Sequence, residues 1–418
     1  MLILTYYWPP AGGSGVQRWL KFVKYLQNFD IEPIVYTVDN ASYPKEDISL
    51  INEVPKNILV LKQPIWEPTD LLFWKKNNNQ KKDISNATNS GLLSFVRGNF
   101  FIPDPKVFWV KPSVKFLHKF LETNKVDAII STGPPHSMHL IAQKLKEKNN
   151  IKWLADFRDP WTDLYYNKEF KQLSFAKKKN LKLEVSVFKN ADCILTVSNS
   201  LKKDFAKKAK RVAVITNGFD DEVLTKNLIR LDKKFTISYI GLLPKQSNPK
   251  LLFKVLNRLC VEDESFKNDL QLNFIGDISN EVKLEIEASN LLENSVFVGY
   301  VSHKEAIEYQ KKSQVLLLLI PNVIKSEGIL TGKLFEYLTA KRPILAIGPK
   351  KGDLSEILKN TNAGVVIGFN DEEMLISEIK KLYQQYKTRS LKVDSKNIEQ
   401  YHRKELTKNL SEIIKSLS

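Results

Sequence analysis

The chain has 418 residues, of which 43% are apolar, and its 64 basic and 47 acidic residues give a formal net charge of +17. This length exceeds that of one typical core and indicates two or three domains of a soluble globular protein. The longest apolar run, Val315 to Ile320, is far shorter than the ~20 residues that cross a bilayer, which excludes a membrane-spanning protein.

Short apolar runs alternate with amphipathic stretches along the chain, a pattern typical of parallel βαβ units. In the first half, strands are expected at Leu2–Tyr6, Pro33–Thr37, Ile58–Leu61, Ala128–Ser131, Lys152–Asp156, Cys193–Val197 and Val212–Ile215. After the polar segment Asp220–Lys234 the pattern restarts, with strands expected at Phe235–Ile240, Leu270–Ile275, Val296–Val298, Val315–Ile320, Ile344–Ile347 and Gly364–Ile367.

These elements predict an α/β protein with two facing, doubly wound, Rossmann-like domains. The first is expected over residues 1–225 and the second over 235–395. Residues 396–418 should form a C-terminal helix that packs back across the first domain. The low-complexity segment Lys75–Gly91 is expected to be a loop. A ligand should lie between the domains, next to the loops that follow the strands.

The first of these loops contains Gly12, Gly13 and Gly15 and leads into a helix, which is the setting of a dinucleotide-binding turn. Arg18 stands where that motif requires its third glycine, so the close approach of helix and strand is lost. Asp39 ends the next strand about 20 residues later, where the acidic residue of a dinucleotide-binding motif binds the ribose, so this motif remains an alternative.

Two further loops of the first half carry ionisable groups. His136 lies at the start of a helix, where backbone amides can face an anion. Arg158 and Asp159 follow a strand that ends at Asp156, with Trp161 beside them. We expect these side chains either to contact the donor or acceptor, or to form an Arg-Asp pair that orients the loop.

In the second half, Gly241 would let a phosphate approach the backbone, and Lys245 would neutralise it. The segment KSEGILTGKLFEYLTAKRPILAIGP gives the stronger signal. Lys333 follows Gly332 at a helix start and would meet a diphosphate, while Glu336, one turn later, would accept hydrogen bonds from ribose hydroxyls.

Six motifs, taken in their order along the chain, resemble those of the bacterial family-4 glycosyltransferases, and the resemblance runs nearly from end to end. The motifs are YYWPPAGGSGVQR, ADFRDPW, ADCILTVSNSL, ITNGFDDE, YIGLLPK and GKLFEYLTAKRPILAIG. The resemblance implies the glycosyltransferase B fold, with a nucleotide-sugar donor held mainly by the second lobe and an acceptor by the first. It also implies transfer with retention and no obligate metal or other cofactor. The absence of any Asp-x-Asp sequence agrees with the last point.

Residue by residue, the resemblance assigns the donor-side glycine turn to Gly13 and Gly15, the phosphate-binding lysines to Lys245 and Lys333, and the ribose-binding glutamate to Glu336. The family's other glutamate should fall on Gly328, one position after Glu327. Either Glu327 reaches the sugar from a shifted loop, or this contact is missing. The family's first-lobe histidine has no counterpart unless His136 or Arg158 serves.

The positive charge favours anionic partners, and no nucleic-acid-binding signature is present. Three segments allow two interpretations. The lysine-rich segments Phe175–Lys189 and Leu201–Arg211 are either solvated helix faces or a surface that attaches to an anionic membrane. The aromatic stretch Leu92–Phe120 either packs in the domain core or takes part in the same attachment. Without a secretory signal pattern, we expect a cytoplasmic protein, peripheral on the inner face of the plasma membrane. Cys193 and Cys260 are expected to be buried, without a disulfide or metal.

The expected function is therefore transfer of a sugar to a glycan or lipid-linked acceptor, in cell-surface polysaccharide synthesis. Three alternatives remain at this stage. A non-catalytic nucleotide-sugar-binding protein and a nucleotide-sugar epimerase would have the same architecture. An NAD-dependent oxidoreductase would use Gly13, Gly15 and Asp39, although no hydride-transfer residues accompany them.

Overall fold

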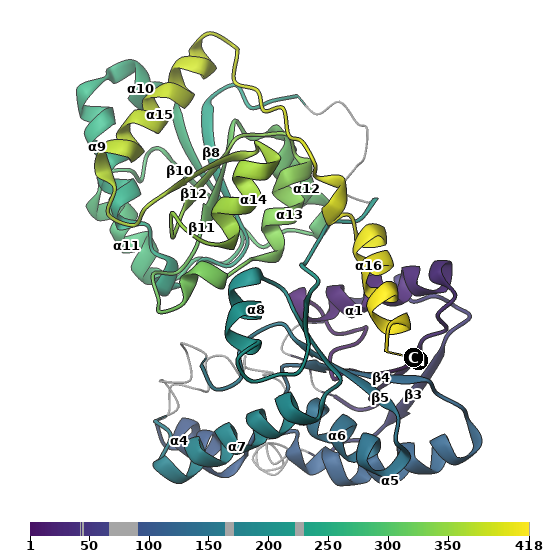
Figure 1. The fold of residues 1–418 in the computed structure, drawn as a ribbon. Helices are drawn as coiled ribbons and strands as arrows, with labels where there is room; N and C mark the ends of the chain where they lie inside the picture. Colours follow the sequence, from purple (N-terminus) through teal and green to yellow (C-terminus); the bar gives the residue numbers. More distant parts are fainter. Residues whose placement is uncertain (42, 44–45, 67–90, 164–170, 222–229, 418) are drawn as a thin grey trace. The chain divides into compact units, whose positions relative to one another are not determined.

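The computed structural model describes residues 1–41, 43, 46–66, 91–163, 171–221 and 230–417. The chain forms two compact units, one of Met1–Thr216 with Arg403–Ser418 and the other of Asn217–His402. In each unit a parallel sheet lies between two layers of helices (Figure 1). The expected loop Lys75–Gly91 lies outside the described residues, apart from Gly91.

In the part of the first unit that the structure describes, seven parallel strands form one sheet in the order β3-β2-β1-β4-β5-β6-β7. The predicted strands are all present, with ends that differ by at most two residues. β4 is buried along its whole length, as expected for a strand covered on both faces. The strands are β1 (Leu2–Leu4), β2 (Ile34–Val38), β3 (Leu59–Gln63), β4 (Ala128–Gly133), β5 (Lys152–Phe157), β6 (Cys193–Thr196) and β7 (Val212–Val214).

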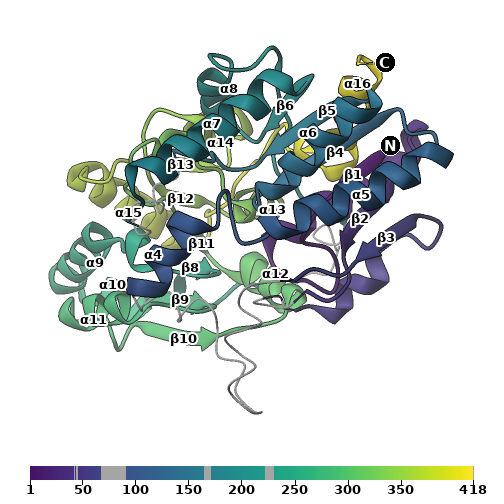
Figure 2. The ribbon, with the colours of Figure 1, turned by 90° about the horizontal axis from the view of Figure 1, so that it is seen from below.

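Helices cover both faces of this sheet, and each layer has its own apolar core. One core contains Trp109, Met138 and Phe188, from the helices that Figure 2 shows along one side of the strands. The helices of the unit are α1 (Ser14–Leu26), α4 (Gly91–Phe100), α5 (Val107–Thr123), α6 (Ser137–Asn149), α7 (Ser174–Asn190), α8 (Asn199–Phe205) and α16 (Arg403–Lys415), with short 3-10 turns η1 (Gln27–Phe29) and η2 (Ile48–Glu53).

The C-terminal helix returns to the first unit, as predicted. Leu406, Leu410 and Ile414 of α16 lie in the same apolar core as Trp19 and Val23 of α1. The helix begins at Arg403 rather than at the predicted Lys396. Residues 396–402 are instead tied to the second unit, where the Lys396 N–H donates to the Thr361 carbonyl at 2.8 Å and η7 (Glu399–Tyr401) makes a 3-10 turn.

The described residues of the second unit contain six parallel strands in the order β10-β9-β8-β11-β12-β13. The strands are β8 (Phe235–Ile240), β9 (Leu270–Ile275), β10 (Ser295–Gly299), β11 (Val315–Leu319), β12 (Ile344–Ile347) and β13 (Gly364–Ile367). The helices are α9 (Lys250–Glu262), α10 (Glu264–Asp269), α11 (Asn280–Ala288), α12 (His303–Lys312), α13 (Gly332–Thr339), α14 (Asp353–Thr361) and α15 (Glu372–Lys387), with 3-10 turns η5 (Lys245–Ser247) and η6 (Ser326–Gly328).

Strand order locates the ligand-binding edge of each sheet. The order of connection reverses between β1 and β4 in the first unit and between β8 and β11 in the second. In doubly wound sheets, ligands bind beyond the carboxyl ends of the strands at such a switch point. Each unit therefore has its own expected binding edge, at the loops after β1 and β4 in the first unit and at the loops after β8 and β11 in the second.

Candidate functional site

The loop after β1 contains the predicted glycine turn. Gly13 is the N-cap of α1, with φ of 88° and ψ of −179°. This region of backbone space is essentially restricted to glycine. A Cβ at Gly13 would have no atom within 4 Å, so the backbone angles rather than crowding require glycine. At Gly15, a Cβ would lie 3.4 Å from Arg158 Nη1, which is ordinary contact distance.

Arg18, the residue in the position of the motif's third glycine, is buried in an ion pair. Its Nε and Nη2 donate to the two carboxylate oxygens of Asp156 at 3.1 and 3.0 Å. Its Nη1 donates to the carbonyl of Thr216 at 3.0 Å. Trp19 and Thr132 also donate to Asp156, at 2.7 and 3.0 Å. Arg18 therefore joins α1 to the end of β5, a role that sequence reasoning missed.

Arg158 also binds backbone. Its guanidinium donates to the carbonyls of Gly15, Gly133 and Pro134 at 3.2, 3.2 and 2.9 Å. Gly15 lies in the first turn of α1, Gly133 ends β4, and Pro134 follows it, so Arg158 holds the start of α1 and the end of β4 together at the switch point. The neighbouring Asp159 has an exposed side chain with no hydrogen-bond partner among the described residues. The Arg-Asp pair of this region is Arg18 with Asp156, whereas direct contact of Arg158 or Asp159 with a substrate stays a prediction.

His136 lies directly before α6 and is only 6% exposed. Its ring stacks on Trp161, with centroids 4.6 Å apart and planes 3° apart. Among the described residues, neither of its ring nitrogens has a hydrogen-bond partner. Burial lowers the pKa of His136 well below its usual value, and the nearby His139 and Arg158 lower it further. The imidazole is therefore neutral at pH 7, and its unprotonated ring nitrogen is able to accept a hydrogen bond.

His139 stands beside His136 but is bonded to the protein. Its Nδ1 is 2.8 Å from Ser131 Oγ, and its ring stacks on Phe157 at 4.4 Å. Burial, reinforced by the charge of Arg158, lowers the pKa of His139 to about 3. The two histidines thus form a neutral aromatic group at the carboxyl end of β4.

In the second unit, glycines end three adjacent strands. Gly241, Gly276 and Gly299 follow or end β8, β9 and β10 with φ values of 118°, 115° and 79°. The Gly241 N–H donates to the Ile275 carbonyl at 2.7 Å, and the Gly276 N–H donates to the Gly299 carbonyl at 2.7 Å. A Cβ on Gly241 would lie 3.0 Å from Lys333 Nζ. Gly241 therefore leaves room for the lysine side chain at the switch point.

Lys333 lies in the first turn of α13, as predicted. Its ammonium donates to Tyr239 Oη at 2.8 Å and lies 4.0 Å from the centroid of that ring. Burial lowers the pKa of Lys333 to about 7, against the opposing effect of Glu336. Gly332 begins the helix, and a Cβ there would meet no atom within 4 Å, so its surroundings are open. The structure brings the end of the Lys333 side chain next to Gly241.

Glu336 is half-buried and bonded to two side chains of α12. Its Oε1 is 3.1 Å from His303 Nε2, and its Oε2 accepts from Gln310 Nε2 at 2.9 Å. Sequence reasoning did not find His303 or Gln310, because no local pattern links them to a residue 26 or 33 positions away. A carboxylate oxygen accepts more than one hydrogen bond, so ribose hydroxyls remain compatible with both contacts.

Two predicted residues are exposed in loops. Lys245 begins the turn η5 after β8. Glu327 lies in η6 after β11, and its backbone packs against Gly352, where a Cβ would lie 2.6 Å from the Glu327 carbonyl oxygen. This packing fixes the backbone of η6 while the Glu327 side chain points to solvent. Whether Glu327 reaches a bound sugar stays a prediction.

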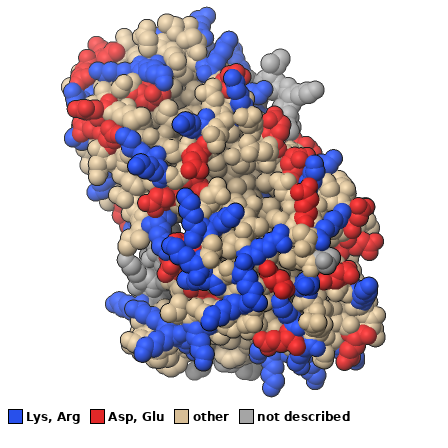
Figure 3. Space-filling view, in the orientation of Figure 1, with Lys and Arg blue, Asp and Glu red and all other residues tan. Residues whose placement is uncertain are grey.

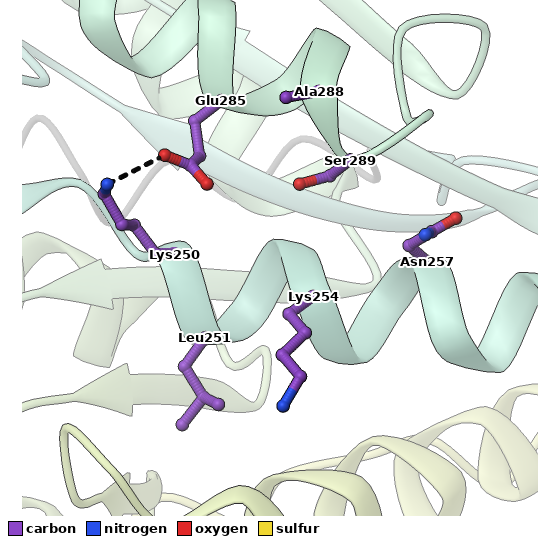
Figure 4. A pocket seen from close by; sticks show the side chains of 7 residues that line it. All are labelled: Lys250, Leu251, Lys254, Asn257, Glu285, Ala288 and Ser289. Atoms are coloured by element: carbon purple, nitrogen blue, oxygen red, sulfur yellow. Dashed lines mark ion pairs between the residues drawn. The ribbon is translucent and has the colours of Figure 1, made fainter.

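Two other features of the second unit do not involve the predicted residues. A groove of about 480 Å³ lies between α9 and α11, bordered by the Lys250–Glu285 ion pair at 3.2 Å (Figure 4). Within the described residues, Asp220, Asp221 and His402 have potential ligand atoms within 4.8 Å of one another. His402 Nε2 is already 3.0 Å from Asp221 Oδ1, so these two side chains contact each other.

The two halves of the chain each match a family profile. The profile described as Glycosyl transferases group 1 matches residues 220–416. The profile described as Glycosyltransferase Family 4 matches residues 15–223, which is half of the chain.

The chain belongs to the family-4 glycosyltransferases.

Solved structures support the same fold for this family-4 glycosyltransferase. A glycosyltransferase from Rickettsia africae is 16% identical, with a TM-score of 0.63 over 100% of this chain and 97% of the other. Anabaena HepE, solved in complex with UDP-glucose, is 13% identical, with a TM-score of 0.63 over 99% of both chains. An E. coli protein described as trehalose-6-phosphate, bound with UDP-2-fluoro glucose, is 11% identical, with a TM-score of 0.62 over 100% of this chain and 99% of the other. None of the curated proteins compared with the chain matches it in sequence.

Proposed function

We propose that this glycosyltransferase moves a sugar from a nucleotide-sugar donor to a glycan or lipid-linked acceptor, with retention of anomeric configuration. The observation that carries the proposal is the contact of the Lys333 ammonium, at the start of α13, with Gly241 at the switch point of the second unit. Phosphate groups are bound by the backbone N–H groups of a helix start and by cationic side chains. The start of α13 provides both, since Lys333 lies in its first turn. Two of the structural neighbours were solved with UDP-sugars, which supports a donor of this class.

Different residues bind different parts of the donor and the acceptor. Lys333, together with the exposed Lys245, offsets the charge of the diphosphate, and Gly241 lets the diphosphate approach the strand end. Glu336 accepts hydrogen bonds from the ribose. In the first unit, the glycine turn at Gly13 and Gly15 serves the donor phosphates and the acceptor, and His136 and Asp159 serve the acceptor and the transferred sugar. Arg158 positions the loops that carry them.

For the chemical step we propose attack on the face of the sugar from which the diphosphate leaves. The acceptor oxygen forms a bond to the anomeric carbon while the bond from that carbon to the phosphate oxygen breaks. The departing phosphate takes the acceptor's proton, so no protein base is required, and in this proposal the lysines rather than a metal ion offset the charge of the diphosphate. The protein's contribution is positioning and stabilisation of the charge that develops on the diphosphate.

A direct test is a screen of nucleotide-sugars with mass detection of the product. Transfer appears as an acceptor heavier by one sugar residue, whereas an epimerase changes the sugar without changing its mass. A non-catalytic binding protein would bind nucleotide and form no product. Because the chain belongs to the glycosyltransferase family, we do not propose an NAD-dependent oxidoreductase. Asp39, the residue that this alternative would use for ribose, is exposed after β2. Failure to bind any nucleotide-sugar or nucleoside diphosphate would overturn the proposed function.

The ribose contact gives the next prediction. Glu336→Gln should weaken binding of the donor nucleotide by about 1.5 to 3 kcal/mol, the range for hydrogen bonds to a charged group. The fold should persist, because an amide still accepts from one of the two partners, His303 and Gln310. Calorimetry on wild type and variant measures the difference. A folded variant with unchanged affinity would exclude Glu336 from the ribose site.

A membrane-bound acceptor would fit the surface around α4 and α7. Phe100 is 65% exposed and Phe175 is 50% exposed, with ring centroids 6.3 Å apart. Basic side chains gather over these helices (Figure 3). Within the described residues, the exposed lysines of α7 have no ion-pair partner; they are Lys177, Lys178, Lys179, Lys182 and Lys189. No described helix is long and apolar enough to cross a bilayer. We therefore propose peripheral attachment to the inner face of the plasma membrane.

Vesicle sedimentation tests this attachment. Binding to vesicles that contain phosphatidylglycerol should exceed binding to neutral vesicles and fall as salt rises. Replacing Lys178, Lys179 and Lys182 by Gln should weaken binding by about 3 kcal/mol, since each basic residue near an anionic surface contributes about 1 kcal/mol. The matched control replaces three exposed lysines of the second unit, Lys359, Lys392 and Lys396. Equal losses in both variants would contradict a docking surface on α7.

A further inference from the structure

The hydroxyl of Tyr239 connects the Lys333 ammonium to the loop after β8. It accepts a hydrogen bond from Lys333 Nζ at 2.8 Å and donates one to the Leu242 carbonyl at 2.8 Å. Tyr239 itself is buried in β8. The rigid strand therefore fixes the hydroxyl, and the hydroxyl fixes the end of a flexible lysine side chain.

The ammonium is held where a ligand at the switch point would meet it. Gly241 follows β8, and the space that its side chain would fill is occupied by the end of Lys333, with Nζ 3.0 Å from the position of a Cβ. The Tyr239 ring contacts the ammonium from the same side as its hydroxyl, with its centroid 4.0 Å from Lys333 Nζ. Without the Tyr239 hydroxyl, the described contacts leave the lysine held only by the ring face, which constrains its direction less.

We propose that Tyr239 is a positioning residue, which fixes the Lys333 ammonium for the diphosphate of a nucleoside diphosphate or nucleotide-sugar. The inference rests on the proposed function, and it adds a residue for which neither the motifs nor the family comparison gives a role. Tyr239 does not touch the diphosphate; it acts through Lys333.

The electrostatic setting of Lys333 supports this role. The titratable groups around it are Tyr239 of β8, Glu336 and Tyr337 of α13, and His303 of α12 through its contact with Glu336. Burial lowers the pKa of Lys333 to about 7. A bound diphosphate favours the charged form, so binding takes up a proton, and affinity should fall as pH rises above about 7. Removing the hydroxyl removes an acceptor for the ammonium and should lower the pKa further.

The test uses Tyr239→Phe in the full chain, with calorimetry on UDP, GDP, ADP and CDP to choose the tightest binder. The variant should bind that diphosphate about 10-fold more weakly at pH 7.5, the size of one hydrogen bond to a charged group. Its fall in affinity with pH should begin at a lower pH than in wild type. Binding of the parent nucleoside should change little. In a Lys333→Met background, Tyr239→Phe should cause no further loss, because the residue through which it acts is gone.

Two further variants separate positioning from general stability. Tyr383→Phe removes another hydroxyl of the same unit, which donates to Asp269 at 2.8 Å, and should leave diphosphate affinity unchanged. Lys333→Arg stays charged at all accessible pH values and should lose the pH dependence. Tyr239→Phe with unchanged affinity and unchanged pH profile, while wild type binds the diphosphate, would overturn the role of Tyr239 alone. Absence of binding by wild type would instead overturn the proposed function.

Discussion

Arg18→Met should lower the free energy of unfolding by about 3 to 5 kcal/mol, the range for removing one partner of a buried ion pair. Arg18 and Asp156 are nearly inaccessible to solvent, at 1% and 0% exposure of their side chains. Methionine fills much of the space but leaves the Asp156 carboxylate buried, with only Trp19 and Thr132 as donors. Urea denaturation of both proteins measures the difference.

An exposed pair provides the matched control. Arg258 donates to Glu262 at 2.7 Å within α9, and both side chains are exposed. Arg258→Met should therefore cost less than about 1 kcal/mol, as exposed ion pairs generally do. Similar losses in the two variants would show that burial does not set the strength of the Arg18 pair. They would also contradict our explanation that Arg18 replaces the third glycine of the dinucleotide-binding turn because it forms this buried pair.

The strands and the loops that bear function were predictable because their signals are local. β-branched runs with polar or glycine-rich boundaries located the sheets, and the order of strand and helix located the loops after them. Gly13, Gly332 and Lys333 are recognisable because each lies at a helix start within a few residues of a strand or a glycine-rich segment. Such features depend on short stretches of sequence.

Side-chain partners were not predictable, because they depend on which elements become neighbours. Arg18 and Asp156 are 138 residues apart in the chain, and Lys333 and Tyr239 are 94 apart. Arg158 illustrates the consequence. From its place after β5 it was expected either to contact the donor or acceptor or to pair with an aspartate. The structure shows its guanidinium donating to the carbonyls of Gly15, Gly133 and Pro134, while contact with a substrate stays a prediction. A strand end identifies the region of a site without identifying what each side chain binds.

Gly13→Ala should lower the rate of sugar transfer by about 100-fold, the cost that a misplacement of about an ångström can have. Gly13 has backbone angles that essentially only glycine adopts, so alanine must move the turn at the start of α1. Apart from its chain neighbours, no described residue has an atom within 4 Å of the added Cβ, so the loss does not arise from a clash with a described residue. The displaced backbone, together with a methyl group in open space beside the turn, would shift the donor phosphate or the acceptor.

Nucleotide affinity should change much less than the transfer rate, because Gly241, Lys333 and Glu336 belong to the second unit. Backbone strain should also cost about 1 to 3 kcal/mol of stability, seen as a lower Tm. The transfer rate, nucleotide affinity and Tm are therefore measured on one preparation of the variant. A lower Tm with normal transfer would reduce Gly13 to a structural glycine. Loss of nucleotide binding in a folded variant would show instead that the glycine turn, and not only the second unit, holds the nucleotide.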